Sequence, residues 1–134
     1  MLKKYGFKHY EISNFCKEGY ASRHNLKYWQ MCEYLGVGPS AHSMIDNKRF
    51  YYPSDLKGFI NNPQIIEDGE VEPYEKLMLG LRIDKGVNID INDKNLMNKI
   101  CLLENAGYVK LNGDNLSLTD TGMLISNSII AELI

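Results

Sequence analysis

Cysteine is scarce in this chain, and the spacing of its cysteines fits neither a disulfide framework nor a metal site. The 134 residues contain three cysteines, Cys16, Cys32 and Cys101, which lie far apart in the sequence. An odd number of widely spaced cysteines does not match a disulfide framework, and no two of them have the short spacing of metal ligands. The pattern therefore favours reduced, packed thiols in a protein of the cytoplasm, with no metal site built by these cysteines.

Long hydrophobic runs and a surplus of basic residues are also absent. No apolar stretch approaches the ~20 residues that a membrane-spanning helix requires, and no apolar signal-peptide core follows Lys3 and Lys4. Lys and Arg number 15 against 17 Asp and Glu, which gives a formal net charge of −2. A nucleic-acid binder usually carries a basic face. We therefore expect a cytoplasmic protein with no transmembrane segment and no nucleic-acid partner.

The chain does contain a glycine-rich stretch, from Glu33 to Ser43, around which the rest is organised. Its first half, 34–38, is typical of a buried strand, and small and polar residues follow directly. Because glycine lacks a Cβ, the backbone here can pass close to another group. The candidate cofactor-binding residues are therefore Gly36, Gly38, Ser40, Ala41 and His42. The spacing alone leaves open the alternative of a glycine-rich turn with no ligand.

The first 53 residues are rich in strand patterns. Residues 2–7 resemble the tail of a helix that ends at Gly6. Polarity alternates over 8–15, which predicts one strand, and the aromatic segment 25–31 predicts a short extended piece. Asp46-Asn47 predicts the turn of a hairpin between two β-prone segments, 43–45 and 49–52.

A short helix and a polar link come next. Ser54 predicts an N-cap for a helix over 55–61, and Asn62-Pro63 ends that helix. Residues 64–71 are polar and acidic and contain Gly69, so we expect a linker and a domain boundary there.

Residues 72–134 predict a unit with its own apolar faces. Pro73 starts a helix that Gly86 stops, and Asn92 or Asp93 caps the next one. The segment 112–115 predicts a tight turn between strands 108–111 and 116–118, and Thr119 caps a last helix. The order helix, helix, hairpin, helix is winged-helix-like, and the expected fold class of the whole chain is α+β.

A winged helix raises the alternative of a stand-alone DNA-binding module. The helix over 93–105 would be its recognition helix, yet it carries only Lys94 and Lys99 against Asp93 and Glu104. Phosphate contacts supply most non-specific DNA affinity. A packing or partner-docking module is therefore the better interpretation.

Five short motifs occur in an order that resembles one known family. They are Tyr10-Glu11-Ile12-Ser13-Asn14-Phe15, Ser22-Arg23-His24-Asn25-Leu26-Lys27-Tyr28-Trp29, Tyr34-Leu35-Gly36-Val37-Gly38-Pro39-Ser40-Ala41-His42-Ser43, Leu79-Gly80-Leu81-Arg82 and Leu118-Thr119-Asp120-Thr121-Gly122. Together they resemble the C-terminal part of the oxygen-independent coproporphyrinogen III oxidase-like family of radical S-adenosylmethionine (SAM) proteins. The resemblance is closest to the haem-chaperone branch, the HemW type.

This resemblance implies a division of the chain and a set of cofactors for the parent protein. Residues 1–53 would be the last strands and hairpin of a partial (β/α) radical SAM barrel, 54–71 a short helix and linker, and 72–134 a winged-helix-like C-terminal domain of the HemN_C type. The parent would hold SAM and a [4Fe–4S] cluster. The chaperone branch also binds haem and passes it to an acceptor protein, whereas the oxidase branch decarboxylates coproporphyrinogen III oxidatively.

The chain departs from the family pattern at the cluster. It has no Cys-x₃-Cys-x₂-Cys motif, so we expect no cofactor to be held, and no catalysis to be performed, by these residues alone. The expected partners are the rest of the barrel, haem and a haem-accepting protein. Exposed strand edges in 1–53 could also pair between copies of the chain.

The resemblance also suggests how the glycine-rich stretch is used. By position, the family's SAM contact falls at His42, with Ala41 and the glycines beside it. The oxidase branch has an aliphatic residue where this chain has His42, so a main-chain contact is implied rather than one by the imidazole. His9, His24 and His42 are the candidate haem ligands, but an isolated histidine is more often structural, and none is assigned.

Overall fold

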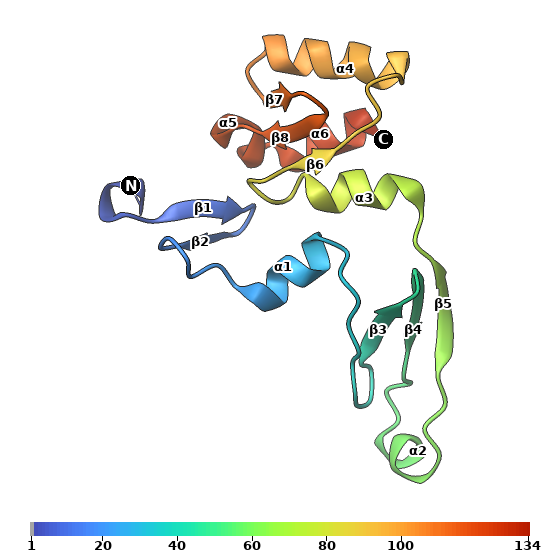
Figure 1. The fold of residues 1–134 in the computed structure, drawn as a ribbon. Coiled ribbons are helices and arrows are strands. Elements are labelled where there is room, and N and C mark those ends of the chain that lie inside the picture. Colours follow the sequence, from blue (N-terminus) through green and yellow to red (C-terminus); the bar gives the residue numbers. More distant parts are fainter. Residues whose placement is uncertain (1) are drawn as a thin grey trace. The chain divides into compact units, whose positions relative to one another are not determined.

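The structure is a computed structural model that describes residues 2–134. It has the expected α+β class, and all of its sheets are antiparallel (Figure 1). The chain forms two compact units, each described here by itself. The larger unit contains the residues up to Gln30 together with Tyr74–Ile134, and the smaller unit contains Met31–Pro73.

The N-terminal part of the larger unit is a hairpin followed by a helix. A 3₁₀ helix, η1 (Leu2–Tyr5), precedes strands β1 (Lys8–Glu11) and β2 (Asn14–Cys16). The expectation of one strand over 8–15 was wrong, because the chain reverses between Glu11 and Asn14. The imidazole of His9 then stacks on its cross-strand partner Phe15, with 4.2 Å between ring centroids.

Helix α1 (Arg23–Trp29) stands where we expected an extended piece. Its N-cap is Ser22, whose hydroxyl accepts a hydrogen bond from the backbone N–H of Asn25. The segment contains no β-branched residue, so its aromatic content alone did not disfavour a helix once the cap was in place.

The rest of the larger unit forms two helices, a three-stranded sheet and two short final helices. These elements are α3 (Pro73–Gly80), β6 (Val87–Asn88), α4 (Lys94–Asn105), β7 (Val109–Asn112), β8 (Asn115–Leu118), α5 (Asp120–Leu124) and α6 (Ser126–Leu133). The strand order is β6-β8-β7. The helix start at Pro73, the caps Asp93 and Thr119 and the β7–β8 hairpin are confirmed.

Two features of this region differ from the sequence expectation. Helix α3 ends at Gly80 rather than Gly86, and a Cβ on Gly80 would lie 2.5 Å from the Cβ of Val87, so the helix end packs on strand β6. The last helix is divided into α5 and α6 at Ile125, whose φ of −121° and ψ of 26° are not helical. The winged-helix-like arrangement stays a prediction.

Most of the hydrophobic core lies in this C-terminal part. The buried cluster consists of Leu81, Val87, Ile100, Val109, Leu116, Leu118, Met123, Ile129, Ile130 and Leu133. The N-terminal hairpin joins it through the main chain. The N–H of Ile12 donates to the carbonyl of Arg82 at 3.0 Å, and the N–H of Asp84 donates to the carbonyl of Tyr10 at 3.0 Å.

The smaller unit is a three-stranded sheet with one short helix. Strands β3 (His42–Ile45), β4 (Lys48–Tyr51) and β5 (Ile66–Glu70) lie in the order β3-β4-β5, and α2 (Leu56–Asn61) separates β4 from β5 in the sequence. The hairpin turn at Asp46-Asn47 is confirmed. Both residues have positive φ, 51° and 59°, as a two-residue turn of this type requires.

Three local expectations for this unit were wrong. The carboxylate of Asp55, rather than Ser54, caps α2. Residues 66–70 are a strand and not a linker, because pairing with β4 holds them although every residue of β5 is exposed. The strand expected over 34–38 is a single bridge between Tyr34 and Met44, and Val37 is 77% exposed.

The compact units also differ from the expected division at 54–71. Residues up to Gln30 group with the C-terminal part because β1 bonds to the segment 82–84. Assignment of 1–53 to a barrel, 54–71 to a short helix and linker and 72–134 to a terminal domain stays a prediction for the parent protein, although 66–70 form strand β5. Among residues 2–134, no helix is long and apolar enough to cross a membrane.

Candidate functional site

The glycine-rich segment is fixed at its start to strand β3. Tyr34 and Met44 exchange both backbone hydrogen bonds, at 3.0 and 2.9 Å. The carboxylate of Glu33 accepts a hydrogen bond from the N–H of Asp46 at 2.9 Å. The segment therefore leaves and rejoins the sheet at defined points, although it contains no strand of its own.

Gly36 is held against the start of β3. Its N–H donates to the hydroxyl of Ser43 at 3.0 Å, and Ser43 is fully buried. A Cβ on Gly36 would stand 2.3 Å from the carbonyl oxygen of His42, so a side chain does not fit there without a shift of the backbone. The close approach expected at this glycine is present, and the group approached is the main chain of His42.

Gly38, Ser40 and Ala41 form a tight turn that bonds to the end of β4. Gly38 has φ +127° with open space around it, and Ser40 has φ +60°. The N–H of Ala41 donates to the carbonyl of Gly38 at 3.1 Å, and the N–H of Ser40 donates to the carbonyl of Tyr52 at 3.0 Å. Glycine is needed at position 38 for its backbone conformation rather than for space.

Two main-chain N–H groups of this segment have no partner among residues 2–134. The N–H groups of Val37 and Gly38 donate to no acceptor in the part of the chain that the structure describes. Met44 bonds to Tyr34, so its polar main-chain groups point away from β4, and those of His42, two residues earlier in the strand, point the same way. The segment therefore has two main-chain donors without an acceptor, at Val37 and Gly38, and the carbonyl of His42 faces Gly36 on the side away from β4.

Each of the three histidines has a contact within its own unit. The exposed His42 ring stacks on Tyr51, with 5.1 Å between centroids. A nitrogen of His9 lies 3.0 Å from the carbonyl of Ile12, and the ring of His24 contacts that of Tyr28 edge-on. Each imidazole thus has a structural contact, and none is singled out as a ligand.

Metal-binding groups are not clustered in the part of the chain that the structure describes. Cys16 is buried, whereas Cys32 and Cys101 are exposed, and all three are free. Within residues 2–134, no three side chains of His, Cys, Asp or Glu gather so as to hold a metal ion. The residues of this chain therefore do not fit an iron–sulfur cluster.

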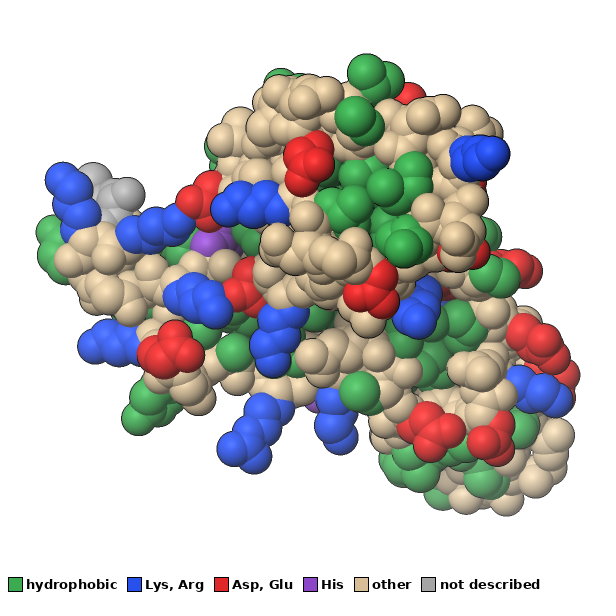
Figure 2. Space-filling model, turned by 45° about the horizontal axis from the view of Figure 1, so that its top comes forward, with side chains coloured by type: hydrophobic (Ala, Val, Ile, Leu, Met, Phe, Trp, Pro, Cys, Tyr) green, Lys and Arg blue, Asp and Glu red, His purple; other side chains and the backbone are tan. Residues whose placement is uncertain are grey.

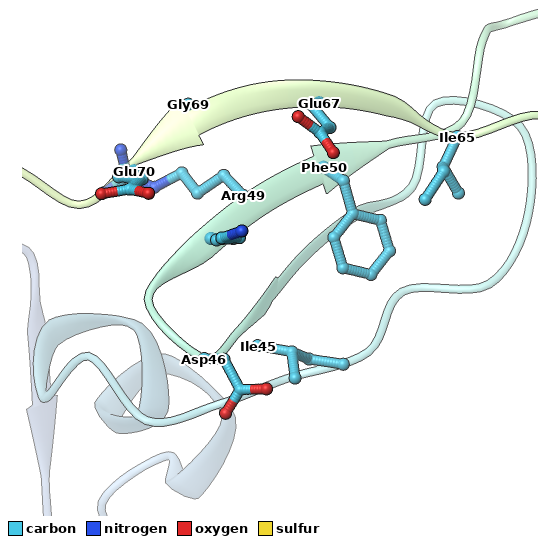
Figure 3. Close-up of a pocket in the computed structure, with 9 residues that line it drawn as sticks. Ile45, Asp46, Arg49, Phe50, Ile65, Glu67, Gly69 and Glu70 are labelled. Atoms are coloured by element: carbon cyan, nitrogen blue, oxygen red, sulfur yellow. The ribbon is translucent and has the colours of Figure 1, made fainter.

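A hollow of about 400 Å³ lies elsewhere in the smaller unit, between the β3–β4 hairpin and β5 (Figure 3). Ile45, Phe50 and Ile65 give it an apolar lining, and Figure 3 shows the ring of Phe50 directed into the space beneath β5. Its charged residues are Asp46, Lys48, Arg49, Glu67 and Glu70. The candidate residues 36–42 do not line this hollow.

Sequence reasoning missed a pair of residues in the larger unit. The guanidinium of Arg82 lies over the ring of Trp29, with 5.1 Å from its carbon to the ring centroid. Arg82 Nε and Trp29 Nε1 are both buried and have no hydrogen-bond partner in the described chain. The signals available in the sequence were that Trp29 is the single tryptophan and that both residues belong to the quoted motifs.

The surface of the C-terminal part gives no support to the DNA-binding alternative. Helix α4 carries Lys94 and Lys99 and is capped by Asp93. Figure 2 shows acidic and basic side chains interspersed with apolar ones over the displayed face. A phosphate backbone would meet few unopposed cations here.

Comparisons with known proteins identify the family that the chain resembles in sequence. A profile described as the HemN C-terminal domain matches residues 68–125. The haem chaperone HemW of Synechocystis sp. is 41% identical over 98 residues, which are 65% of this chain and 24% of that protein. The haem chaperone HemW of Buchnera aphidicola subsp. Schizaphis graminum is 31% identical, over 96% of this chain and 39% of that protein.

A solved structure gives the same result for the fold. Coproporphyrinogen III oxidase (HemN) from Escherichia coli, a radical SAM enzyme, superposes with a TM-score of 0.68 at 13% identity, over 98% of this chain and 38% of that one. The chain thus spans well under half of the length of these proteins. It belongs to the HemN/HemW-like family of radical SAM proteins and corresponds to the C-terminal region of that family.

Proposed function

We propose that this chain is the C-terminal part of a radical SAM protein that binds haem and transfers it to an acceptor protein. The proposal rests on its relatives: two bacterial proteins with 41% and 31% identity are haem chaperones. The similarity to the oxidase is 13% in sequence, so it supports the fold and not the decarboxylation. The partners of this chain would be the rest of its barrel, haem and a haem-accepting protein.

Within this function, the segment Gly36–His42 contacts SAM through its main chain. The observation that supports this assignment is the pair of N–H groups at Val37 and Gly38 that have no acceptor in the described chain, beside the main chain of His42. Such groups fit the hydrogen-bonding edges of a nucleoside, and a side chain at Gly36 would displace the backbone that presents them. When bound, SAM supplies radical chemistry after reductive cleavage.

The residues of the segment have separable roles in this contact. Ser43 fixes Gly36 through its hydroxyl, Gly38 allows the turn, and Ser40 and Ala41 tie the turn to the end of β4. The ring of His42 is stacked on Tyr51 and takes no part in this main-chain contact. A haem-ligating role for this ring is the alternative use of the same residue.

Calorimetric titration of SAM tests the assignment in a protein that contains this region together with a complete radical SAM barrel. Gly38→Val should weaken SAM binding at least tenfold, which corresponds to about 1.4 kcal/mol, and His42→Ala should change it less than that. Gly69→Val is the matched control, because Gly69 also has positive φ, +85°, and open space but lies in β5. Equal loss in both glycine variants would mean that backbone strain, and not the contact, is measured.

If His42→Ala abolishes binding while Gly38→Val does not, the imidazole is the functional group. The Soret absorption of bound haem in the His42→Ala protein then separates haem ligation from SAM contact.

A further inference from the structure

We infer that Arg82 and Trp29 form a binding site for a ligand carboxylate. The inference starts from two hydrogen-bond donors that lack acceptors. Arg82 Nε and Trp29 Nε1 are buried and unpaired in the described chain, and a buried donor without a partner is destabilising. Most buried donors in folded proteins are paired, so two such groups on contacting side chains indicate an acceptor that the chain does not itself provide.

The two side chains are positioned by different elements of the larger unit. Trp29 is the last residue of α1. Arg82 follows α3, and its backbone carbonyl accepts a hydrogen bond from the N–H of Ile12, which fixes this segment. The guanidinium lies over the indole, 5.1 Å from the ring centroid. The indole therefore covers one face of the guanidinium and leaves its edge, which carries the N–H groups, for a ligand once the side chain turns.

Two acidic residues of the bonded segments, Glu11 and Asp84, already have other partners. The carboxylate of Glu11, which is 1% exposed, accepts a hydrogen bond from the side chain of Asn14. Asp84 forms an ion pair with Lys8 at 2.8 Å. No ion pair joins either carboxylate to Arg82 among residues 2–134. The recorded side-chain contact of the Arg82 guanidinium is with the aromatic face of Trp29.

The charge of the surroundings also favours an anion. Residues 1–30 contain six Lys and Arg, at positions 3, 4, 8, 17, 23 and 27, against Glu11 and Glu18. A planar guanidinium binds a carboxylate with two parallel hydrogen bonds, and the indole N–H adds a third donor. Both residues are partly exposed as a whole, so a ligand can reach the pair, and the two side chains have to turn their buried donors toward it.

If the proposed function holds, a propionate group of haem is the carboxylate that this site would bind. Haem carries two propionates on an aromatic macrocycle. The site would bind one propionate through Arg82 while the indole of Trp29 offers an aromatic surface beside it. This identification of the ligand rests on the proposed function, whereas the carboxylate site itself rests only on the unpaired donors.

Propionate tests the site without haem. In ¹⁵N–¹H spectra of the 134-residue chain, the single indole resonance of Trp29 and the Nε–H resonance of Arg82 should shift saturably with propionate and not with propionamide. Arg82→Gln should abolish the indole shift, whereas Arg23→Gln, an exposed position on α1, should retain it. No shift with propionate, or the same shift with propionamide, would overturn the site.

Haem and its dimethyl ester test the source of the carboxylate by quenching of Trp29 fluorescence. Haem should bind about tenfold or more tightly than the ester, as loss of a charge-assisted hydrogen bond predicts, and Arg82→Gln should remove this preference. Equal binding of haem and ester alongside a propionate response would support the carboxylate site and exclude a haem propionate as its ligand. Failure of both porphyrins to bind would exclude a haem propionate as the ligand of this site, with the carboxylate site itself still decided by propionate.

Discussion

Gly122 and Tyr108 are in direct main-chain contact. A Cβ on Gly122 would stand 1.9 Å from the carbonyl oxygen of Tyr108, and it would also lie 3.4 Å from the side chain of Ile129. The same carbonyl accepts a hydrogen bond from the N–H of Thr119, the N-cap of α5. Helix α5 can therefore seat against the start of β7 only if residue 122 has no side chain.

Gly122→Ala should lower the free energy of unfolding by about 1–3 kcal/mol, the range for overpacking, although alanine favours helices. The measurement is a urea unfolding curve. Thr121→Ala, at the exposed neighbouring position of α5, should stay within about 0.5 kcal/mol of the parent chain. Similar midpoints for the two variants would show that α5 can shift away from Tyr108 at little cost.

Ser43 should control the order of the glycine-rich segment. Its hydroxyl is the acceptor for the N–H of Gly36, and removing the acceptor leaves that donor unpaired beside a buried strand. Ser43→Ala should therefore cost about 1–3 kcal/mol locally, seen as faster hydrogen exchange of the Gly36 amide. Ser54→Ala is the control, because Asp55 and not Ser54 caps α2. Unchanged exchange at Gly36 in Ser43→Ala would contradict this role.

Lys3 and Asp120 give the chain an acid-sensitive contact. The hydrogen bond from the Lys3 ammonium lowers the pKa of the Asp120 carboxyl below its ordinary value of 3.8. A carboxyl with a lowered folded-state pKa contributes stability above pH 3.8, and this contribution is lost as the pH falls through the lowered pKa. The side chains are 62% and 69% exposed, so the contribution is about 0.5 kcal/mol.

Lys3→Met should therefore make the decline in the free energy of unfolding at acid pH shallower. Lys4→Met, at the adjacent exposed position of η1, should leave the slope as it is in the parent chain. The comparison uses urea midpoints taken on both sides of the ordinary pKa. Equal slopes in the two variants would mean that the Lys3 contact does not persist in solution.

The features that the sequence predicted well are those decided by neighbouring residues. Helix starts depend on residues within one turn of Pro73, Asp93 and Thr119, and the hairpin turn depends on Asp46-Asn47 themselves. A short stretch of sequence is therefore enough to predict each of them. The wrong predictions concern segments whose structure depends on pairing with residues distant in the sequence. Strand β5 exists because β4 pairs with it, and the N-terminal hairpin joins the larger unit because β1 bonds to the segment around Ile83.

The candidate site likewise combines features that the local sequence predicts with features that depend on the fold. A close approach at Gly36 could be anticipated because glycine permits it, but the sequence could not say that the approaching group is the carbonyl of His42. Trp29 and Arg82 are far apart in the chain, and only the fold brings them into contact. Their missing acceptor is a property of three-dimensional packing, which no spacing rule reports.

Hydrogen exchange should separate the two compact units. The buried hydrophobic cluster lies entirely within the larger unit, from Leu81 to Leu133, whereas only Ser43 and Met44 are buried in the smaller unit. Amides exchange slowly where buried apolar contacts are dense, since opening there approaches global unfolding. The slowest amides should therefore be those of Ile100, Val109 and Leu116.

The N-terminal hairpin provides the critical comparison in that experiment. The N–H of Ile12 donates to the carbonyl of Arg82. This amide should therefore exchange as slowly as its neighbours in the larger unit, although Ile12 is only 32 residues from Met44 in the sequence. The N–H of Met44, bonded to Tyr34 at 2.9 Å, should exchange faster, because its unit has few buried neighbours to resist opening. Equal protection of Ile12 and Met44 would contradict two units of different stability. Protection of Met44 alone would mean that the hairpin is not held by the segment 82–84.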